Sequence, residues 1–596
     1  MMELPVHRTP RFGPLIRDDG VVFRFWAPKQ RRVRLQLDGT TLPMQSLGGW
    51  HSLETTASFG SRYCFVLESG QAVPDPASRF QPADVHGPSE LVDPAAYRWR
   101  NTTWRGRPWH ETVLYELHVG TFTSEGTFAG AARRLEDLAE LGVTAIQLMP
   151  VADFPGRRNW GYDGVLPFAP DAAYGRPEGL KGFIDTAHGL GLSVMLDVVY
   201  NHYGSEGNYQ PLYAPVFTER HETPWGAAVN YDDEGSAEVR AFVIENVLYW
   251  LEEFRFDGLR FDAVHEIRDS SEFHLLEEIR TAVAAIAPDR PVHLVLENEE
   301  NSAAWLTRRE GEAVGFTAQW NDDMHHVLHV AVTGESSAYY GDYTNRPRLL
   351  GRALAEGFAF QGEKMPYRGR PRGEASGHLP PESFIAFLQN HDQVGNRATG
   401  DRIHHGHTLA AVRAAAATYL LAPQIPMLFQ GEEWAASTPF TFFCDVDAEL
   451  AEKVREGRRN EFSRFPEYAK PEARAAIPDP VSEQTFQTAK LRWREREDAP
   501  HADVLAWYRR ILNVRASKIV PLIPDFMQGG RYKVGEQGVV EVRWEGESGT
   551  VLAVVLNLSA TPKLLDEVIE GRPVWIEGHK VGAALAPWTV VWTLRP

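Results

Sequence analysis

The stretch that decides the fold is Phe256-Asp257-Gly258-Leu259-Arg260-Phe261-Asp262-Ala263-Val264-His265. It follows a predicted helix over residues 236–254 and sets Arg260 and Asp262 at alternate positions among apolar residues. Residues two apart on a strand project to the same face, so these two side chains should meet. A buried carboxylate held ionised by a guanidinium is typical of a functional site.

Apolar strand-like segments recur on both sides of this stretch, and each is followed by a helix or a helix-sized segment. The eight segments are residues 113–119, 143–149, 193–199, 256–262, 292–297, 316–320, 384–389 and 425–429. Buried strands that alternate with helices indicate a parallel sheet covered on both faces, and eight such units predict a (β/α)8 TIM barrel. An open doubly wound sheet is the alternative, but no Gly-rich phosphate loop follows the first strand.

Short strands with alternating polarity lie before and after the barrel. We therefore predict an α/β fold with an N-terminal β-sandwich at 1–95, a linker at 96–110, the catalytic barrel with short inserted loops at 111–518, and a C-terminal β-sandwich at 519–596.

Composition excludes several classes of partner. The 596-residue chain carries a formal net charge of −19, which makes nucleic acid and anionic membrane poor partners. No apolar run is long enough to span a bilayer, and residues 1–8 lack the layout of a signal peptide. The two cysteines, Cys64 and Cys444, imply no disulfide framework. We expect a cytoplasmic protein.

Acidic residues and histidines gather at the predicted strand ends. They are Asp197 and His202 after the third strand, Asp262 and His265 after the fourth, Glu297 after the fifth, and His391 and Asp392 after the seventh. A lone acid at a strand end is more often a helix cap. Several that converge on one barrel rim indicate a site, because unpaired carboxylates repel one another. Paired carboxylates with Arg and His support fit glycoside cleavage.

Metal chemistry is the alternative that the histidines raise. His325, His326 and His329 stand at helical spacing, and His404, His405 and His407 lie together in a predicted loop. Neither group has the HExxH pattern, so we interpret them as solvated or structural residues and predict no metal and no cofactor.

Four segments, in order, resemble the signature regions of the α-amylase superfamily (glycoside hydrolase family 13): residues 197–202, 258–262, 297–299 and 390–392. Residues 22–28 also resemble the N-terminal sandwich of its glycogen- and starch-modifying members. The resemblance implies that Asp262 is the nucleophile of a retaining mechanism, Glu297 the proton donor and Asp392 the transition-state stabiliser. It further implies a substrate-binding set of Tyr162, Asp197, His202, Arg260, His265 and His391.

The sequence departs from the general α-amylase pattern at positions that resemble one subfamily. Val264-His265 stands where many α-amylases have Lys-His, and residues 318–326, 390–397 and 430–440 resemble maltooligosyltrehalose trehalohydrolases. These glycosidases cut the α-1,4 bond next to the terminal trehalose of maltooligosyltrehalose. The resemblance implies maltooligosyltrehalose, trehalose and maltooligosaccharides as ligands, and action alongside a maltooligosyltrehalose synthase. Because residues 202–235 are too few for the calcium-binding domain of α-amylases, no metal is expected.

The residues that would recognise trehalose are a separate hypothesis. Asn321, Asp322 and Asp323 could hydrogen-bond sugar hydroxyls, with Trp320 as a wall, and a helix N-cap is an equally good interpretation of the same residues. The rival functions are a glycogen branching or debranching enzyme, a non-catalytic glucan-binding protein, and a metal-dependent hydrolase.

Overall fold

The computed structural model describes residues 9–286, 290–309, 312–463, 465, 468 and 470–596. The expectation that no signal peptide is present concerns residues 1–8, which lie outside the described residues.

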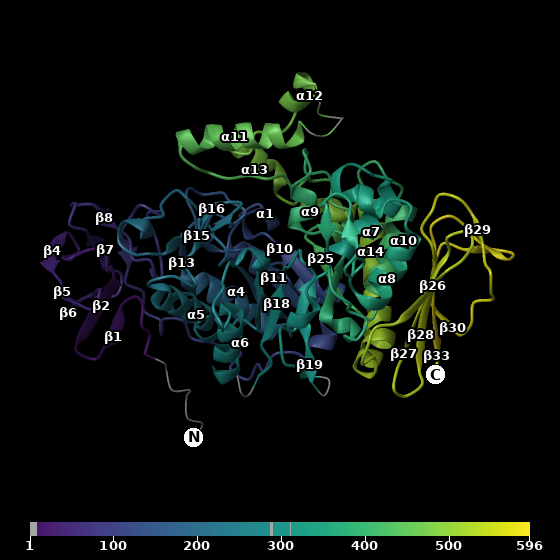
Figure 1. The fold of residues 1–596 in the computed structure, drawn as a ribbon, viewed down its shortest axis with the longest axis horizontal. Coiled ribbons are helices and arrows are strands. Elements are labelled where there is room, and N and C mark those ends of the chain that lie inside the picture. Colours follow the sequence, from purple (N-terminus) through teal and green to yellow (C-terminus); the bar gives the residue numbers. More distant parts are fainter. Residues whose placement is uncertain (1–8, 287–289, 310–311, 464, 466–467, 469) are drawn as a thin grey trace.

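A closed barrel of eight parallel strands forms the centre of the molecule (Figure 1), and all eight predicted strands are confirmed. Its strands, in order, are β10 (Leu114–Leu117), β11 (Ala145–Leu148), β14 (Ser193–Val198), β17 (Gly258–Phe261), β18 (His293–Leu296), β21 (Ala318–Trp320), β24 (Phe384–Phe387) and β25 (Ile425–Phe429). β25 pairs with β10 and closes the barrel. Every residue of these strands is buried, as expected for a sheet covered on both faces.

Helices surround this barrel and supply its outer layer. The main ones are α3 (Leu135–Leu141), α4 (Pro177–Gly189), α5 (Ser236–Glu252), α6 (Leu275–Ile286), α7 (Asp322–Thr333), α8 (Pro347–Glu356), α10 (Leu409–Leu420) and α14 (His501–Val514). Their apolar faces join the outward-facing strand residues in one continuous core. Inward-facing residues of the strands form a second apolar cluster inside the barrel. The carboxyl ends of the strands are thereby fixed on a rigid frame.

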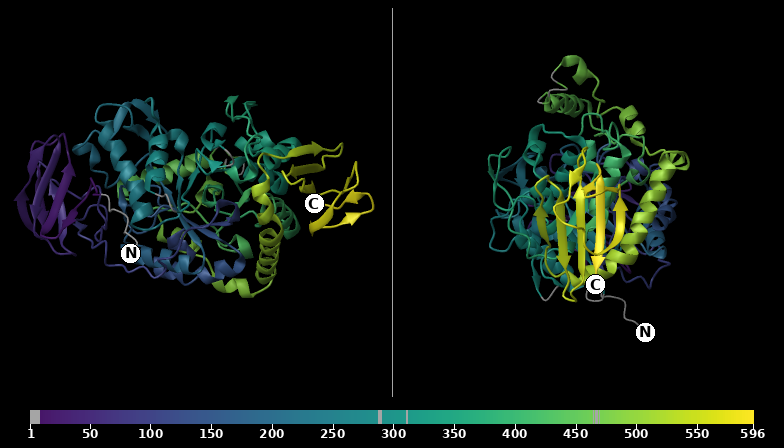
Figure 2. Two further views of the ribbon diagram at one scale, coloured as in Figure 1. Left: turned by 90° about the horizontal axis from the view of Figure 1, so that it is seen from below. Right: turned by 90° about the vertical axis from the view of Figure 1, so that its right-hand side faces the viewer.

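Two groups of sheets lie at opposite ends of the barrel (Figure 2). The first N-terminal sheet has the order β1 (Leu15–Arg17), β2 (Gly20–Trp26), β6 (Trp50–Thr55) and β5 (Gln45–Leu47). The second has the order β4 (Thr40–Pro43), β3 (Arg34–Leu37), β7 (Arg62–Val66) and β8 (Ala72–Val73), and β9 (Ser89–Glu90) also pairs with β7. Phe25 stacks on Phe65 across the two sheets at 4.3 Å between ring centroids. The C-terminal group is a five-stranded sheet with the order β26 (Arg531–Val534), β27 (Val540–Glu545), β28 (Val551–Asn557), β33 (Thr589–Arg595) and β30 (Arg572–Glu577), and a three-stranded sheet accompanies it within residues 563–585. It is anchored to the barrel layer by Trp592, whose indole donates to the Ala417 carbonyl on α10 at 2.9 Å.

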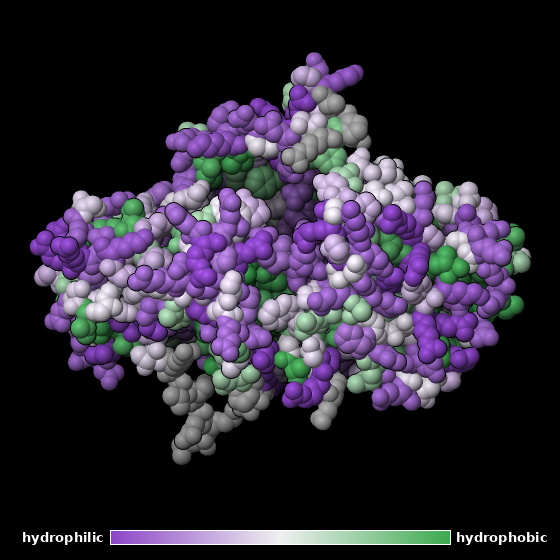
Figure 3. Space-filling model, viewed as in Figure 1, coloured by the Kyte–Doolittle hydropathy of each residue, from purple (hydrophilic) through white to green (hydrophobic). Residues whose placement is uncertain are grey.

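A helical insertion follows β25. It comprises α11 (Ala448–Phe462), α12 (Pro471–Ala475) and α13 (Glu483–Ala489), and it projects above the barrel in Figure 1. Figure 3 shows the surface hollowed beneath it, with hydrophobic side chains under the insertion and hydrophilic ones beside them. No helix among the described residues is both long and apolar enough to cross a membrane.

Candidate active site

Arg260 is the centre of the polar cluster at the carboxyl ends of the strands. Parallel pairing of β14 with β17 sets Arg260 beside Asp197. Its Nη1 donates to Asp197 Oδ2 and to Asp262 Oδ1, each at 2.7 Å, and its Nη2 lies 3.1 Å from Glu297 Oε2. The predicted meeting of Arg260 and Asp262 is confirmed. Because the side chain of Arg260 is only 2% exposed, these ion pairs are screened little by water.

The groups around Asp262 favour its ionised form. Asn201 Nδ2 donates to its Oδ2 at 2.7 Å, on the side away from Arg260. Burial alone would raise the pKa of Asp262, but Arg260, His202 and the Asn201 hydrogen bond outweigh burial, and the pKa lies below its ordinary value.

The pKa of Glu297 is shifted in the opposite direction to that of Asp262. The backbone N–H of Ala263 donates to Glu297 Oε2 at 2.6 Å, which fixes the carboxyl group beside the end of β17. Burial raises its pKa well above the ordinary value; Arg260 opposes this, while Asp262, Asp322 and Asp392 add to it. Two neighbouring carboxyl groups whose pKa values are pushed apart are the arrangement that acid and nucleophile roles require.

The sequence interpretation missed Glu116, which sits on β10 and orients His391. Both its oxygens accept hydrogen bonds from His391, one from the backbone N–H at 2.8 Å and one from Nδ1 at 2.6 Å. Burial would lower the pKa of His391, but the Glu116 carboxylate raises it above its ordinary value. The available signal was a single acidic residue inside the otherwise apolar segment 113–119.

Tyr162 joins the histidine side of the cluster to the carboxylates. Its hydroxyl donates to Asp197 Oδ2 at 2.8 Å, and its ring stacks on the His391 ring at 5.1 Å between centroids. His202 accompanies it, with Nε2 2.9 Å from the Tyr162 carbonyl oxygen and its ring stacked on Trp225. These predicted residues therefore form one wall of the cluster.

Asp392 completes the acidic set from α9 (His391–Gly395). Asn396, one turn further on, donates to Asp392 Oδ1 at 2.5 Å, and burial raises the pKa of Asp392 above its ordinary value. Arg458 of the helical insertion reaches the same segment and donates to the Gly395 carbonyl at 2.8 Å. The insertion is thus attached to the loop that carries Asp392.

His265 follows β17 in the short 3-10 helix η3 (Val264–Glu266) and contacts the loop after β18. Its Nδ1 accepts from the backbone N–H of Glu299 at 3.3 Å, and burial lowers its pKa.

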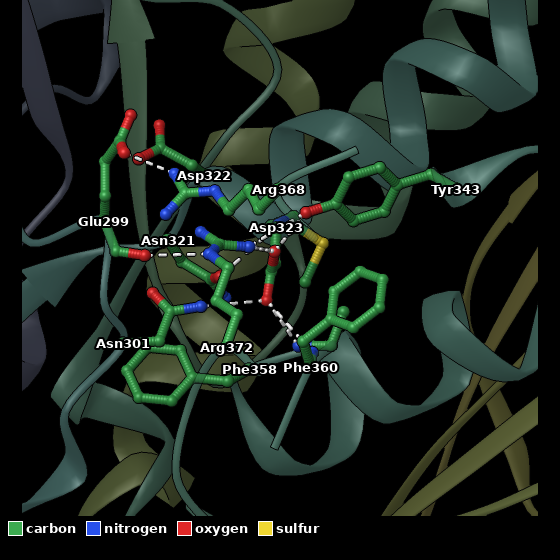
Figure 4. A network of polar contacts seen from close by, with 12 residues as sticks. Glu299, Asn301, Asn321, Asp322, Asp323, Tyr343, Phe358, Phe360, Arg368 and Arg372 are labelled. Atoms are coloured by element: carbon green, nitrogen blue, oxygen red, sulfur yellow. Dashed lines mark hydrogen bonds and ion pairs between the residues drawn. The ribbon is translucent and has the colours of Figure 1, made fainter. Parts of the chain in front are cut away.

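Two of the residues predicted to bind trehalose are corrected by the structure (Figure 4). Asn321 is the N-cap of α7: its side chain accepts from the Met324 N–H and donates to the Gly357 carbonyl at 2.8 Å. Asp323 is fully buried and is satisfied by Arg372, by the Tyr343 hydroxyl at 2.5 Å, and by the Ala359 N–H at 2.7 Å. Both side chains are committed to the protein's own groups.

Trp320 and Asp322 occupy different environments. Trp320 is buried inside the barrel, with the Arg260 guanidinium 4.2 Å from the centroid of its ring, so it supports Arg260 rather than forming a surface wall. Asp322 is partly exposed and accepts from Gln393 Nε2 at 3.3 Å. Burial, with Asp392 and Glu299 nearby, raises the pKa of Asp322 to about 7.

The histidine groups are structural where their contacts are described. His325 Nδ1 lies 2.7 Å from the Leu388 carbonyl oxygen, His329 Nε2 lies 3.0 Å from Glu335, and His404 Nε2 lies 3.1 Å from the Ala436 carbonyl oxygen. Within the described residues, no group of three or more His, Cys, Asp or Glu side chains is arranged to hold a metal ion.

Comparison with known proteins identifies the family. Residues 79–214 match the family model described as alpha amylase, catalytic domain, and residues 527–592 match a domain of unknown function, DUF3459. The malto-oligosyltrehalose trehalohydrolase of Deinococcus radiodurans is 43% identical over 84% of this chain and 82% of that protein. The chain belongs to the malto-oligosyltrehalose trehalohydrolase family. The family member of Saccharolobus solfataricus is 41% identical over 85% of this chain and 86% of its own length.

Membership in this trehalohydrolase family makes the chain a glycosidase of the α-amylase superfamily, and the rival functions are not favoured. A 1,4-alpha-glucan branching enzyme of Streptomyces coelicolor is 31% identical over 52% of this chain and 48% of its own length. A crystal structure from Salmonella typhimurium superposes with a TM-score of 0.94, at 45% identity over 98% of this chain and 100% of that one. An Anoxybacillus pullulanase, with a TM-score of 0.70 at 16% identity, shares the fold.

Proposed function

We propose that this chain hydrolyses the α-1,4-glucosidic bond next to the terminal trehalose of maltooligosyltrehalose and releases trehalose by a retaining mechanism. The family comparison supports the substrate, and the observation that carries the retaining mechanism is the divided behaviour of two carboxyl groups at one guanidinium. Asp262 has a lowered pKa and Glu297 a raised one, although both contact Arg260. Binding to one guanidinium also supports the short separation of about 5 to 5.5 Å that retaining enzymes use.

In the first step, the Asp262 carboxylate attacks the anomeric carbon of the glucose at the cleaved bond. The bond to the trehalose oxygen breaks as the Glu297 carboxyl group gives that oxygen its proton, and trehalose leaves. In the second step, the Glu297 carboxylate takes a proton from water, and the water oxygen displaces Asp262 from the anomeric carbon. Both carboxyl groups return to their starting states.

The attacked glucose would lie between the carboxylates and the wall of Tyr162, His202 and His391. The His391 ring, whose Nδ1 contacts Glu116 and whose pKa that carboxylate raises, would donate from Nε2 to a sugar hydroxyl. Asp392 would accept from hydroxyl groups and favour the oxocarbenium-like ring. Asp197 would act through Arg260 and Tyr162, to which it is bonded.

The wider setting follows from the same proposal. A maltooligosyltrehalose synthase would supply the substrate, and the protein would act in the cytoplasm, which its two free, buried cysteines support. We also propose the division into residues 1–95, 96–110, 111–518 and 519–596, with catalysis confined to the third part.

Product analysis tests the proposed function. The chain is incubated with maltotriosyl trehalose and, separately, with maltopentaose, and the sugars released are separated by anion-exchange chromatography. Free trehalose and maltotriose from the first substrate are expected, with a much slower reaction on the second. Asp262→Asn should abolish both. Transfer to new α-1,6 branches without release of trehalose would favour the branching-enzyme alternative and overturn the proposal.

A further inference from the structure

Gln147 lies inside the barrel at the level of Arg260. It pairs in register with Met195 of β14, and Met195 pairs with Gly258, two residues before Arg260 on β17. The same advance of two residues at every second strand continues round the closed barrel and returns to Gln147. Alternate strands of such a barrel fill one interior layer with four side chains. The members of this layer are Gln147, Arg260, Trp320 and Met427.

Packing contacts agree with this layer. Trp320 and Met427 belong to the apolar cluster inside the barrel, and so does Ala145, which precedes Gln147 by two residues and shares its face of β11. The guanidinium carbon of Arg260 lies 4.2 Å from the centroid of the Trp320 ring. Gln147 therefore projects into the interior, toward the space that Arg260 and Trp320 share.

The acids of the site lie directly above this layer. Gln147 pairs with Glu116 and Arg260 pairs with Asp197, and the stagger of the strands sets both acids one level higher. From the lower layer, Arg260 reaches up to three carboxyl groups with Nη1 and Nη2, those of Asp197, Asp262 and Glu297. The placement of this guanidinium thus sets the surroundings of the two proposed catalytic carboxyl groups.

Four buried polar atoms of the lower layer have no hydrogen-bond partner among the described residues. They are Oε1 and Nε2 of Gln147, Nε of Arg260 and Nε1 of Trp320. Gln147 has no exposed surface, and Trp320 and Arg260 have almost none, so bulk water does not reach these atoms. Buried polar groups are nearly always paired with protein or with an internal water molecule, because an unpaired group costs as much as a lost hydrogen bond.

The chemistry of these four atoms fits a bound water molecule. The N–H groups of a guanidinium and an indole can only donate, so the amide oxygen of Gln147 is the acceptor of the set. A water molecule can accept from Arg260 Nε and Trp320 Nε1 and donate to Gln147 Oε1. Because neither amide atom is bound to a described residue, the amide can turn its oxygen toward that water.

We propose that Gln147 is a positioning residue, which holds the Arg260 guanidinium beneath the catalytic carboxyl groups through a water molecule bound inside the barrel. With Nε held from below and both Nη atoms bound above, the plane of the guanidinium is fixed. The inference rests on the proposed function for the roles of Asp262 and Glu297 and adds what positions the arginine that they share. Gln147 is fully buried and does not contact the substrate, so it acts on catalysis and not on binding.

Two measurements test this inference. A high-resolution crystal structure of the wild-type protein should contain an ordered water within hydrogen-bond distance of Gln147, Arg260 Nε and Trp320 Nε1. Steady-state kinetics on maltotriosyl trehalose then compare the wild type with Gln147→Met and Met427→Leu. Gln147→Met keeps the length of the side chain and removes both amide atoms, whereas Met427→Leu repacks the same layer and leaves the amide in place.

Gln147→Met should lower kcat about tenfold, the order for one hydrogen bond to a charged group, and should leave KM nearly unchanged. A less firmly placed guanidinium favours the ionised form of Asp262 less, so the acid limb of the pH profile should move to higher pH. Met427→Leu, which conserves volume, should keep both kcat and the acid limb close to those of the wild type. Should Gln147→Met fail to fold, Gln147→Asn withdraws the amide by one methylene and should show the same losses.

The outcomes separate the inference from the function on which it rests. A wild-type structure without a water at this place overturns the inference, and so do an unchanged kcat and acid limb in Gln147→Met. Equal losses in Met427→Leu would assign the effect to packing of the layer and would also overturn it. A wild type that releases no trehalose overturns the proposed function alone, because the water site and the pH profile on maltopentaose still decide the role of Gln147.

Discussion

Replacing Arg260 by Gln should move the acid limit of catalysis toward neutral pH. Arg260 Nη1 lies 2.7 Å from Asp262 Oδ1 inside a buried cluster. A charge separation of about 4 Å and an effective dielectric constant of about 20 give an interaction of about 4 kcal/mol, which favours the ionised form of Asp262. Removing the guanidinium should therefore raise the pKa of Asp262, although Asn201 and His202 still favour the ionised carboxylate in the variant.

The measurement is the pH dependence of kcat/KM on maltotriosyl trehalose. In the wild type, Asp262 has a lowered pKa, so the nucleophile stays ionised until the pH falls below its ordinary range. Arg260→Gln should lose activity at a higher pH than the wild type as the pH is lowered, whereas Arg260→Lys keeps the charge and should lose kcat without moving the acid limb. Arg240→Gln, which breaks a buried ion pair with Asp269 outside the site, controls for general destabilisation. An acid limb at the same pH in Arg260→Gln and the wild type would refute the reasoning.

Three further predictions concern residues around the site. Glu116→Gln leaves one acceptor oxygen for the two donors of His391, so kcat/KM should fall about tenfold to hundredfold. The pKa of the His391 ring, followed by NMR, should also fall. An unchanged titration of the ring would contradict the role of Glu116. Asp322→Ala should reduce kcat/KM more on maltotriosyl trehalose than on maltopentaose, and an equal loss would remove Asp322 from the trehalose subsite. Asp323→Ala leaves the buried Arg372 without its carboxylate and should lower the free energy of unfolding by about 3 to 5 kcal/mol. Denaturant unfolding measures this loss, with the exposed Arg370→Ala as the control. A loss below about 1 kcal/mol would contradict the structural role of Asp323.

The barrel could be predicted because its signal is local. Buried parallel strands appear in the sequence as short apolar runs. Because the carboxyl ends of barrel strands lie at one rim, the acids at the ends of those runs were predicted to meet there: Asp197, Asp262, Glu297 and Asp392. The contact of Arg260 with Asp262 followed from strand alternation alone.

The remaining contacts depended on partners distant in sequence. Glu116 and His391 are 275 residues apart, and no periodic pattern in one segment reports such a pair. Asp323 reads as a possible ligand-binding acid until Arg372, 49 residues later, is seen to bind it inside the protein. Asn321 was open to two interpretations, an N-cap and a sugar-binding residue, because both roles use the same side-chain amide. In the structure it is the N-cap of α7.

The central claim is retaining cleavage beside trehalose, and proton NMR of the first turnover products tests it most directly. Maltotriosyl trehalose is mixed with the enzyme, and the anomeric signals are followed before mutarotation of the freed maltotriose is complete. We predict the signal of free trehalose together with maltotriose released as its α anomer. Maltotriose that appears first as the β anomer would contradict the nucleophilic role of Asp262, and fragments without free trehalose would contradict the position of the cleaved bond.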